Sequence, residues 1–207
     1  SEFDGTKEEG DVWFYSYLND YDDNQVGEGG YDEFTWSEGD DIPEGCKEEV
    51  PALLTTTWNQ YAPYYNATPL DNGQPSLTGC VATALAQIMN YYQYPEKYAD
   101  GTKIDWNQML PTYEGVEYTD AQANAVAQLM VHCGEAVNTT YGSGVSTAYP
   151  KEAATGLPAK FGYIVKYYGY RDYPNAQDAK LWKEVVFREL SAGRPVLYGG
   201  TSYKNGE

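Results

Sequence analysis

One run of the sequence constrains the fold more than any other. From Cys80 to Tyr92 the chain places Ala, Leu, Ile and Met on nearly every side of a helical period, and Pro95 closes the run. A helix that is apolar all round has to be buried among other elements. The sequence therefore predicts a central buried helix that carries Cys80 in its first turn.

Four further elements follow from the spacing of apolar residues. Two amphipathic stretches predict helices at about residues 120–132 and 178–192, and Gly134 is placed to end the first of them. Two short apolar runs predict strands at residues 163–168 and 195–198. Helices and strands mixed in this way, without an internal repeat, favour an α+β fold over a solenoid or a propeller.

Charge and composition exclude several classes of partner. The chain has 13 Lys and Arg against 31 Asp and Glu, for a net charge of −18. Such an excess repels nucleic acid and anionic membrane surfaces. No run approaches the roughly 20 apolar residues of a membrane span, and no intact signal peptide is expected at the start. Three scattered Cys residues favour neither a disulfide framework nor a zinc site, so we expect no metal or cofactor.

The acidic residues concentrate in residues 1–49, where glycines interrupt them. We interpret this segment as a separate, solvated unit whose aromatic residues allow it to dock as an extended arm; a mobile acidic tail is the alternative. Residues 50–207 have the composition of a globular unit. The sequence therefore predicts a boundary near Pro51.

Two residues are candidates for a catalytic site, one as a nucleophile and one as a hydrogen-bond donor. Cys80 follows Gly79 at the start of a helix, where unpaired N–H groups and the helix dipole favour a thiolate. The side-chain amide of Gln60 is able to donate a hydrogen bond to a developing oxyanion. From the residues alone, a structural role for Cys80 and a surface or capping role for Gln60 remain alternatives.

A family resemblance rests on motifs spread over residues 50–203. They are Trp58-Asn59-Gln60 with Pro63 and Asn66, Thr78-Gly79-Cys80-Val81-Ala82-Thr83-Ala84, Ala86-Gln87-Ile88-Met89, Tyr94-Pro95, Trp106-Asn107-Gln108-Met109-Leu110-Pro111, Tyr141-Gly142-Ser143-Gly144 and Arg194-Pro195-Val196. Together they resemble the streptopain family of bacterial cysteine peptidases, which includes the interpain-type enzymes of anaerobes. The resemblance implies a papain-like α+β fold, Cys80 as the nucleophile, and Gln60 with the backbone N–H of Cys80 as oxyanion donors.

The resemblance also concerns the substrate cleft. It implies that the polar loop with Ser143 and Gly144 lies near the cleft, and Gly79 is the third residue expected to bind substrate. A plain connecting role for the loop is the alternative.

The chain departs from the family at its catalytic histidine. In the family this residue lies in a Gly-Gly-His-Ala-Phe-like segment after the last strand, and no such segment occurs up to Glu207. We therefore expect the sheet to be incomplete at its C-terminal side and the histidine to come from a missing segment or a second chain. His132 is not expected to be the base, because the matching family position is not catalytic and it points about 100° away from its neighbour Cys133 on a helix. Cys133 is expected in the core, and Cys46 is either free or cross-linked.

The resemblance implies a secreted cysteine endopeptidase that hydrolyses proteins, often with an apolar residue two positions before the cut. Residues 1–49 are expected to be a propeptide remnant or a linker, and residues 50–207 the truncated catalytic domain. An inactive fragment or binding remnant of such a peptidase is the alternative. An acidic adhesin-like surface protein is a third, weaker hypothesis.

Overall fold

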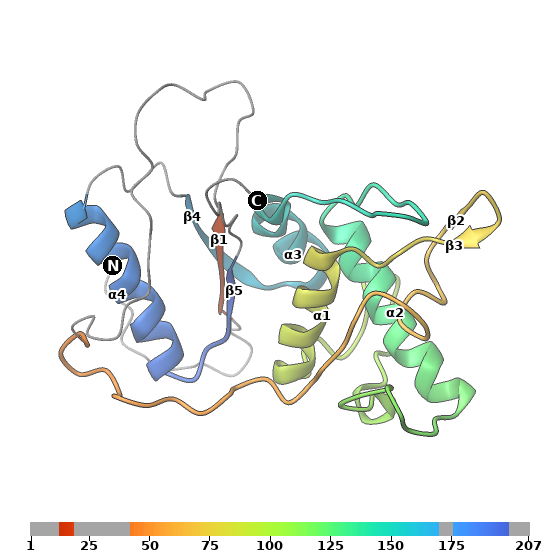
Figure 1. Cartoon of the computed structure of the whole chain (residues 1–207), viewed down its shortest axis with the longest axis horizontal. Coiled ribbons are helices and arrows are strands. Elements are labelled where there is room, and N and C mark those ends of the chain that lie inside the picture. The colour runs from red at the N-terminus through yellow and green to blue at the C-terminus, as the bar shows by residue number, and fades with distance from the viewer. Residues whose placement is uncertain (1–12, 19–41, 170–175, 199–207) are drawn as a thin grey trace, which may run out of the picture.

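The computed structural model describes residues 13–18, 42–169 and 176–198 (Figure 1). Its elements, in chain order, are β1 (Trp13–Leu18), β2 (Leu70–Asp71), β3 (Gln74–Pro75), α1 (Cys80–Tyr92), η1 (Trp106–Gln108), α2 (Asp120–Ala136), η2 (Pro150–Glu152), α3 (Ala153–Phe161), β4 (Ile164–Gly169), α4 (Ala176–Ser191) and β5 (Val196–Tyr198).

The central helix predicted from the sequence is α1, and its bounds are confirmed. It lies between the three-stranded sheet on one side and α2 on the other (Figure 1). Leu85, Ala86 and Met89 are fully buried in the core. Burial on two sides explains why α1 needs apolar residues around its whole circumference.

The second predicted helix exists, but its predicted end is wrong. α2 begins at a capping box formed by Thr119 and Gln122, and it continues past Gly134 to Ala136. A Cβ at position 134 would overlap the hydroxyl of Tyr141. Gly134 is therefore a site of close packing inside the helix, and it does not end the helix.

The main sheet has the order β4-β1-β5, and both pairs of strands are parallel. β4 and β5 confirm the two predicted strands to within one residue at either end. The strand between them, β1, comes from the acidic segment that we expected to be separate and solvated. Its backbone pairs on both sides, so residues 13–18 belong to the sheet. The assignment of residues 1–49 as a propeptide remnant or linker stays a prediction.

The sequence does not predict α3, because Gly156 and Pro158 both have a low helix propensity. A Cβ at Gly156 would overlap the carbonyl oxygen of Ala136, so α3 packs against the end of α2 with its backbone. α4 confirms the third predicted helix and lies on the other side of the sheet from α1 (Figure 1). None of the described helices is long and apolar enough to cross a membrane.

Candidate active site at the start of α1

Cys80 is the first residue of α1, and its side chain is exposed. Gly79 precedes it with φ 86° and ψ 141°, a conformation that residues with a side chain rarely adopt. The carbonyl oxygen of Gly79 accepts hydrogen bonds from the backbone N–H and the hydroxyl of Thr83, both at 3.0 Å. No side chain caps the helix start. The N–H groups of the first turn therefore remain available to a negatively charged group beside the thiol.

Gln60 is brought to the same end of α1 by backbone contacts. The N–H of Thr78 donates to the carbonyl oxygen of Gln60 at 3.5 Å, two residues before Cys80. The segment before Gln60 is tied to α1 through Gln87, whose Oε1 accepts from the hydroxyl of Thr56 at 3.0 Å and from the N–H of Trp58 at 3.2 Å. The half-buried Gln60 is thus tied through its backbone to the segment that leads into Cys80, and its role as an oxyanion donor stays a prediction.

The loop with Ser143 and Gly144 also contacts the segment that leads to Cys80. The N–H of Leu77 donates to the carbonyl oxygen of Gly142 at 3.1 Å. A Cβ at Gly79 would lie 3.6 Å from the Cβ of Ser146, so the loop contacts the residue before Cys80. A Cβ at Gly144 would meet nothing within 4 Å. Gly79 adjoins Cys80, and the loop that carries Ser143 and Gly144 contacts Gly79 through Ser146; the substrate-binding role of the three residues remains a prediction.

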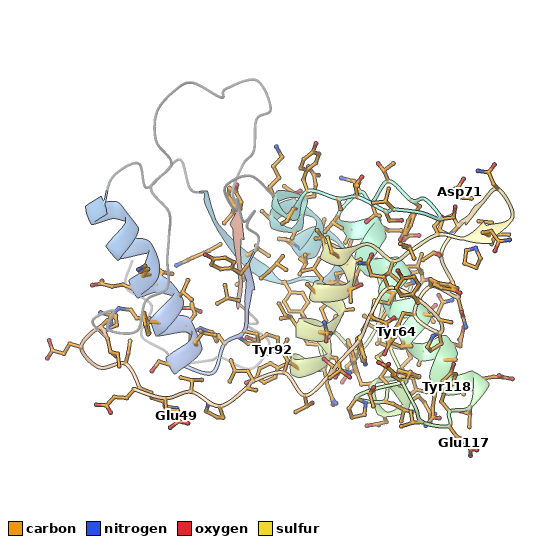
Figure 2. All side chains as sticks on the ribbon, in the orientation of Figure 1. Glu49, Tyr64, Asp71, Tyr92, Glu117 and Tyr118 are labelled. Carbon is orange, nitrogen blue, oxygen red and sulfur yellow. The ribbon has the colours of Figure 1, made fainter. Side chains whose placement is uncertain are left out.

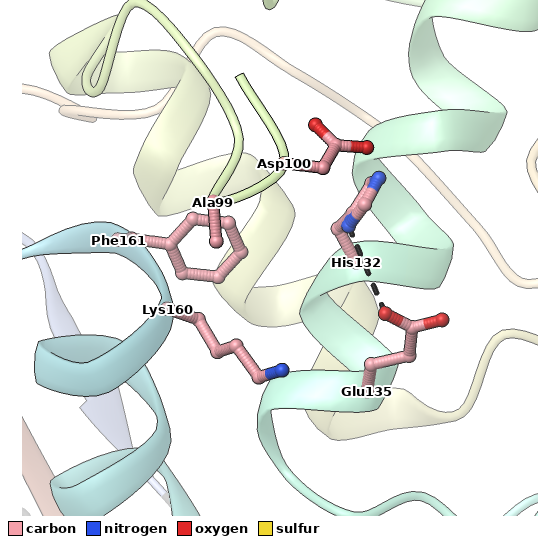
Figure 3. Close-up of a pocket in the computed structure, with 6 residues that line it drawn as sticks. All are labelled: Ala99, Asp100, His132, Glu135, Lys160 and Phe161. Atoms are coloured by element: carbon pink, nitrogen blue, oxygen red, sulfur yellow. Dashed lines mark ion pairs between the residues drawn. The ribbon is translucent and has the colours of Figure 1, made fainter. Parts of the chain in front are cut away.

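His132 lies elsewhere. Its ring stacks on Tyr98 with centroids 3.8 Å apart, and its Nδ1 lies 3.7 Å from a carboxylate oxygen of Glu135. His132 and Glu135 line a pocket of about 240 Å³ together with Asp100 and Lys160 (Figure 3).

Cys133, the next residue after His132 on α2, shows which part of α1 lies beside His132. The Sγ of Cys133 lies 3.5 Å from the Sδ of Met89. Met89 follows Cys80 by nine residues on α1, which places it roughly 13 Å further along the axis. This position supports the expectation that His132 is not the base for Cys80.

The three cysteines occupy different environments, and all are free thiols. Cys133 is fully buried, as predicted, and burial raises the pKa of its thiol. Cys46 is half-buried, and only Cys80 is exposed. In the described part of the chain no group of three or more His, Cys, Asp or Glu residues is arranged to hold a metal ion.

Sequence reasoning missed two residues that shape this site. Asp71 accepts two hydrogen bonds from Ser143, and Gln87 holds the segment that carries Gln60. The Asn72-Gly73 dipeptide between β2 and β3 is a hairpin signal that was available in the sequence. Gln87 carries no comparable local signal.

Comparison with known proteins places these features in context. The model of the Peptidase C10 family matches residues 58–207. Streptopain from Streptococcus pyogenes is 32% identical over an alignment that covers 72% of this chain and 45% of streptopain. The chain therefore spans less than half the length of that relative. The thiol protease/hemagglutinin PrtT of Porphyromonas gingivalis is 30% identical, with 69% of this chain and 18% of that protein covered.

Solved structures agree with the sequence comparison. The active cysteine protease interpain A of Prevotella intermedia is 38% identical, with a TM-score of 0.60, and the match covers 70% of this chain and 67% of that one. A prointerpain A fragment from the same organism is 36% identical, with a TM-score of 0.59, and covers 70% of this chain and 52% of that one. The predicted papain-like α+β fold is confirmed by these neighbours.

Proposed function

The chain belongs to the Peptidase C10 family, and from this premise we propose that it acts as a cysteine endopeptidase whose nucleophile is Cys80. The observation that carries the proposal is the exposed thiol of Cys80 at an uncapped helix start, with Gln60 tethered beside it. A buried structural cysteine would need neither the exposure nor the free N–H groups around it.

The chemistry proceeds in two steps. The Sγ of Cys80 forms a bond to the scissile carbonyl carbon, and the carbonyl π electrons move to the oxygen. The side-chain amide of Gln60 and the backbone N–H of Cys80 donate hydrogen bonds to that oxyanion. The oxyanion then collapses and the C–N bond breaks, as the leaving amine takes a proton from an imidazolium that had received it from the Cys80 thiol. In the second step water gives a proton to the imidazole, attacks the thioester carbon and releases the acid and the Cys80 thiolate.

The imidazole has to come from outside these 207 residues. His132 is the only histidine in them, and it packs on Tyr98 away from the start of α1. We place the base in another segment of the full-length protein or in a second chain. The chain by itself is then a peptidase domain with a reactive thiol and very slow turnover.

Substrates, location and regulation are further parts of the proposal. We propose that the substrates are proteins and that the protein is secreted. The similarity to prointerpain A supports a precursor form, with residues 1–49 as part of a propeptide or a linker to one.

Thiol alkylation compares the reactivity of the exposed Cys80 with that of the half-buried Cys46 and the buried Cys133. The full-length protein is treated with iodoacetamide at neutral pH, and modified positions are followed by peptide mass spectrometry. We expect Cys80 to react at least about ten-fold faster than Cys46, while buried Cys133 reacts only after unfolding. Equal rates at Cys80 and Cys46 would mean that the helix start does not activate the thiol.

Turnover of a peptide substrate by the full-length protein tests the roles directly. Cys80→Ala should reduce kcat by at least about 10³-fold, and Gln60→Ala by on the order of 10² to 10³. Cys46→Ala is the matched control and should stay within about two-fold of the unmodified protein. Full activity of Cys80→Ala would overturn the assignment of the nucleophile.

A further inference from the structure

The loop beside the nucleophile is a small closed hairpin. Thr140 and Thr147 exchange backbone hydrogen bonds of 2.8 and 3.0 Å. Inside the turn, the hydroxyl of Ser146 accepts from the N–H of Gly142 at 3.0 Å and donates to the carbonyl oxygen of Gly142 at 3.2 Å. These bonds close residues 142–146 into one turn. We call residues 142–146 the cleft turn.

Apolar packing does not hold the outer part of the cleft turn. Val145 is 68% exposed, and a Cβ at Gly144 would meet nothing within 4 Å. Its position beside Gly79 therefore depends on polar contacts made by the rest of the turn. One of them is the bond from the N–H of Leu77 to the carbonyl oxygen of Gly142.

The other contact comes from Asp71, on the hairpin of β2 and β3. One oxygen, Oδ2, accepts from the backbone N–H of Ser143 at 2.9 Å and from its hydroxyl at 2.8 Å. The other oxygen accepts from the side-chain amide of Asn72 at 2.9 Å. Figure 2 shows Asp71 on this hairpin, at the end of the molecule beyond α2. The two bonds from Ser143 hold the pKa of the Asp71 carboxyl below its usual value, so it is ionised at neutral pH.

We propose that Asp71 is a positioning residue that holds the cleft turn beside Gly79, and that it thereby sets the affinity for peptide substrate. This inference rests on the proposed function, because the cleft turn matters only if peptides bind at the start of α1. Asp71 itself does not touch the reacting atoms. Its loss should weaken binding in the ground state and the transition state alike, which raises KM and leaves kcat nearly unchanged.

The test uses steady-state kinetics of the full-length protein on a peptide substrate. Asp71→Ala should raise KM about ten-fold, which corresponds to about 1.4 kcal/mol, with kcat within about two-fold. Asp71→Asn keeps an acceptor oxygen and should recover most of the affinity. Ser143→Ala keeps the backbone N–H and should fall between the unmodified protein and Asp71→Ala.

Two further measurements show that the effect acts through the contact. The double variant Asp71→Ala/Ser143→Ala should be no worse than Asp71→Ala alone, because both changes remove the same interaction. Asp100→Ala is the matched control: this exposed carboxylate accepts from the N–H of Thr102 at 2.8 Å and lies in the pocket with His132. Its KM should stay within about two-fold of the unmodified value.

The outcomes separate this inference from the function on which it rests. Unchanged KM in Asp71→Ala, or additive effects in the double variant, would overturn the positioning role while Cys80 chemistry stands. A fall in kcat with unchanged KM would also overturn it. If no preparation hydrolyses peptides and Cys80 reacts no faster than Cys46, the proposed function itself fails.

Discussion

The ion pair between Glu189 and Arg194 offers a sharp test of how the end of α4 is joined to β5. Glu189 is 4% exposed, and the side chain of Arg194 is 16% exposed. The guanidinium makes two parallel bonds to the carboxylate, from Nε at 2.5 Å and from Nη2 at 2.8 Å. The N–H of Arg194 also donates to the carbonyl oxygen of Glu189 at 2.9 Å. This geometry is the bidentate arrangement in which charge-assisted hydrogen bonds are strongest.

Replacing Glu189 by Gln removes the negative charge and leaves the shape nearly unchanged. Breaking a buried pair by removing one partner costs about 3–5 kcal/mol, because the other charge stays buried. Arg194 retains some exposure, so we expect the lower figure, about 3 kcal/mol. For a chain of this size that loss lowers Tm by roughly 6–12 °C.

Urea denaturation followed by far-UV circular dichroism measures the free energy of unfolding. Glu117→Gln is the matched control, because Glu117 is exposed, and it should change the free energy by less than about 0.5 kcal/mol. The double variant Glu189→Met/Arg194→Met should recover most of the loss, since it removes both charges. A cost below about 1 kcal/mol for Glu189→Gln, or a double variant as unstable as the single one, would refute the reasoning.

Three other changes test the packing and the site. Gly134→Ala should lower the free energy of unfolding by about 1–3 kcal/mol, because the new Cβ overlaps the hydroxyl of Tyr141; in thermal melts, the added change Tyr141→Phe should restore part of the loss. Burial raises the pKa of Tyr64 to about 12. The contribution of the neutral, buried hydroxyl to the stability of the fold is therefore complete below about pH 10 and is lost as the pH rises from there. The last part of the rise in phenolate absorbance, after the exposed tyrosines have ionised, should therefore coincide with loss of the circular dichroism signal; completed ionisation of all 22 tyrosines in a folded protein would contradict this. His132→Ala should leave turnover of the full-length protein within about two-fold, and a loss of about 100-fold or more would return His132 to the mechanism.

The best-predicted part of the molecule is α1, because its signals are local. A continuous apolar run, the glycine before Cys80 and the proline after Tyr94 all act within a few residues of the helix they define. The same locality explains why α4 was predicted closely, with Gly193 and Pro195 after its end. Such elements follow from propensity and periodicity without knowledge of their neighbours.

The elements that were missed depend on tertiary contacts. Gly134 and Gly156 disfavour helix locally, yet both lie within helices because a neighbouring group occupies the space of a side chain. β1 pairs with β4 and β5, which lie far along the chain, and its acidic surroundings suggested a solvated segment. Local sequence has no means of showing which distant strand will pair with it.

The site combines both kinds of information. The start of α1 is encoded around Cys80, but Gln60 and the cleft turn reach it largely through backbone bonds at Thr78 and Leu77. Every residue except proline offers a backbone N–H, so such bonds restrict residue type very little. The bond between Asp71 and Ser143, 72 residues apart, is a contact of side chains and does depend on residue type. The proposed positioning of the cleft turn is therefore tested most directly by substitutions at these two positions, because changes at Leu77 or Thr78 leave the backbone bonds in place.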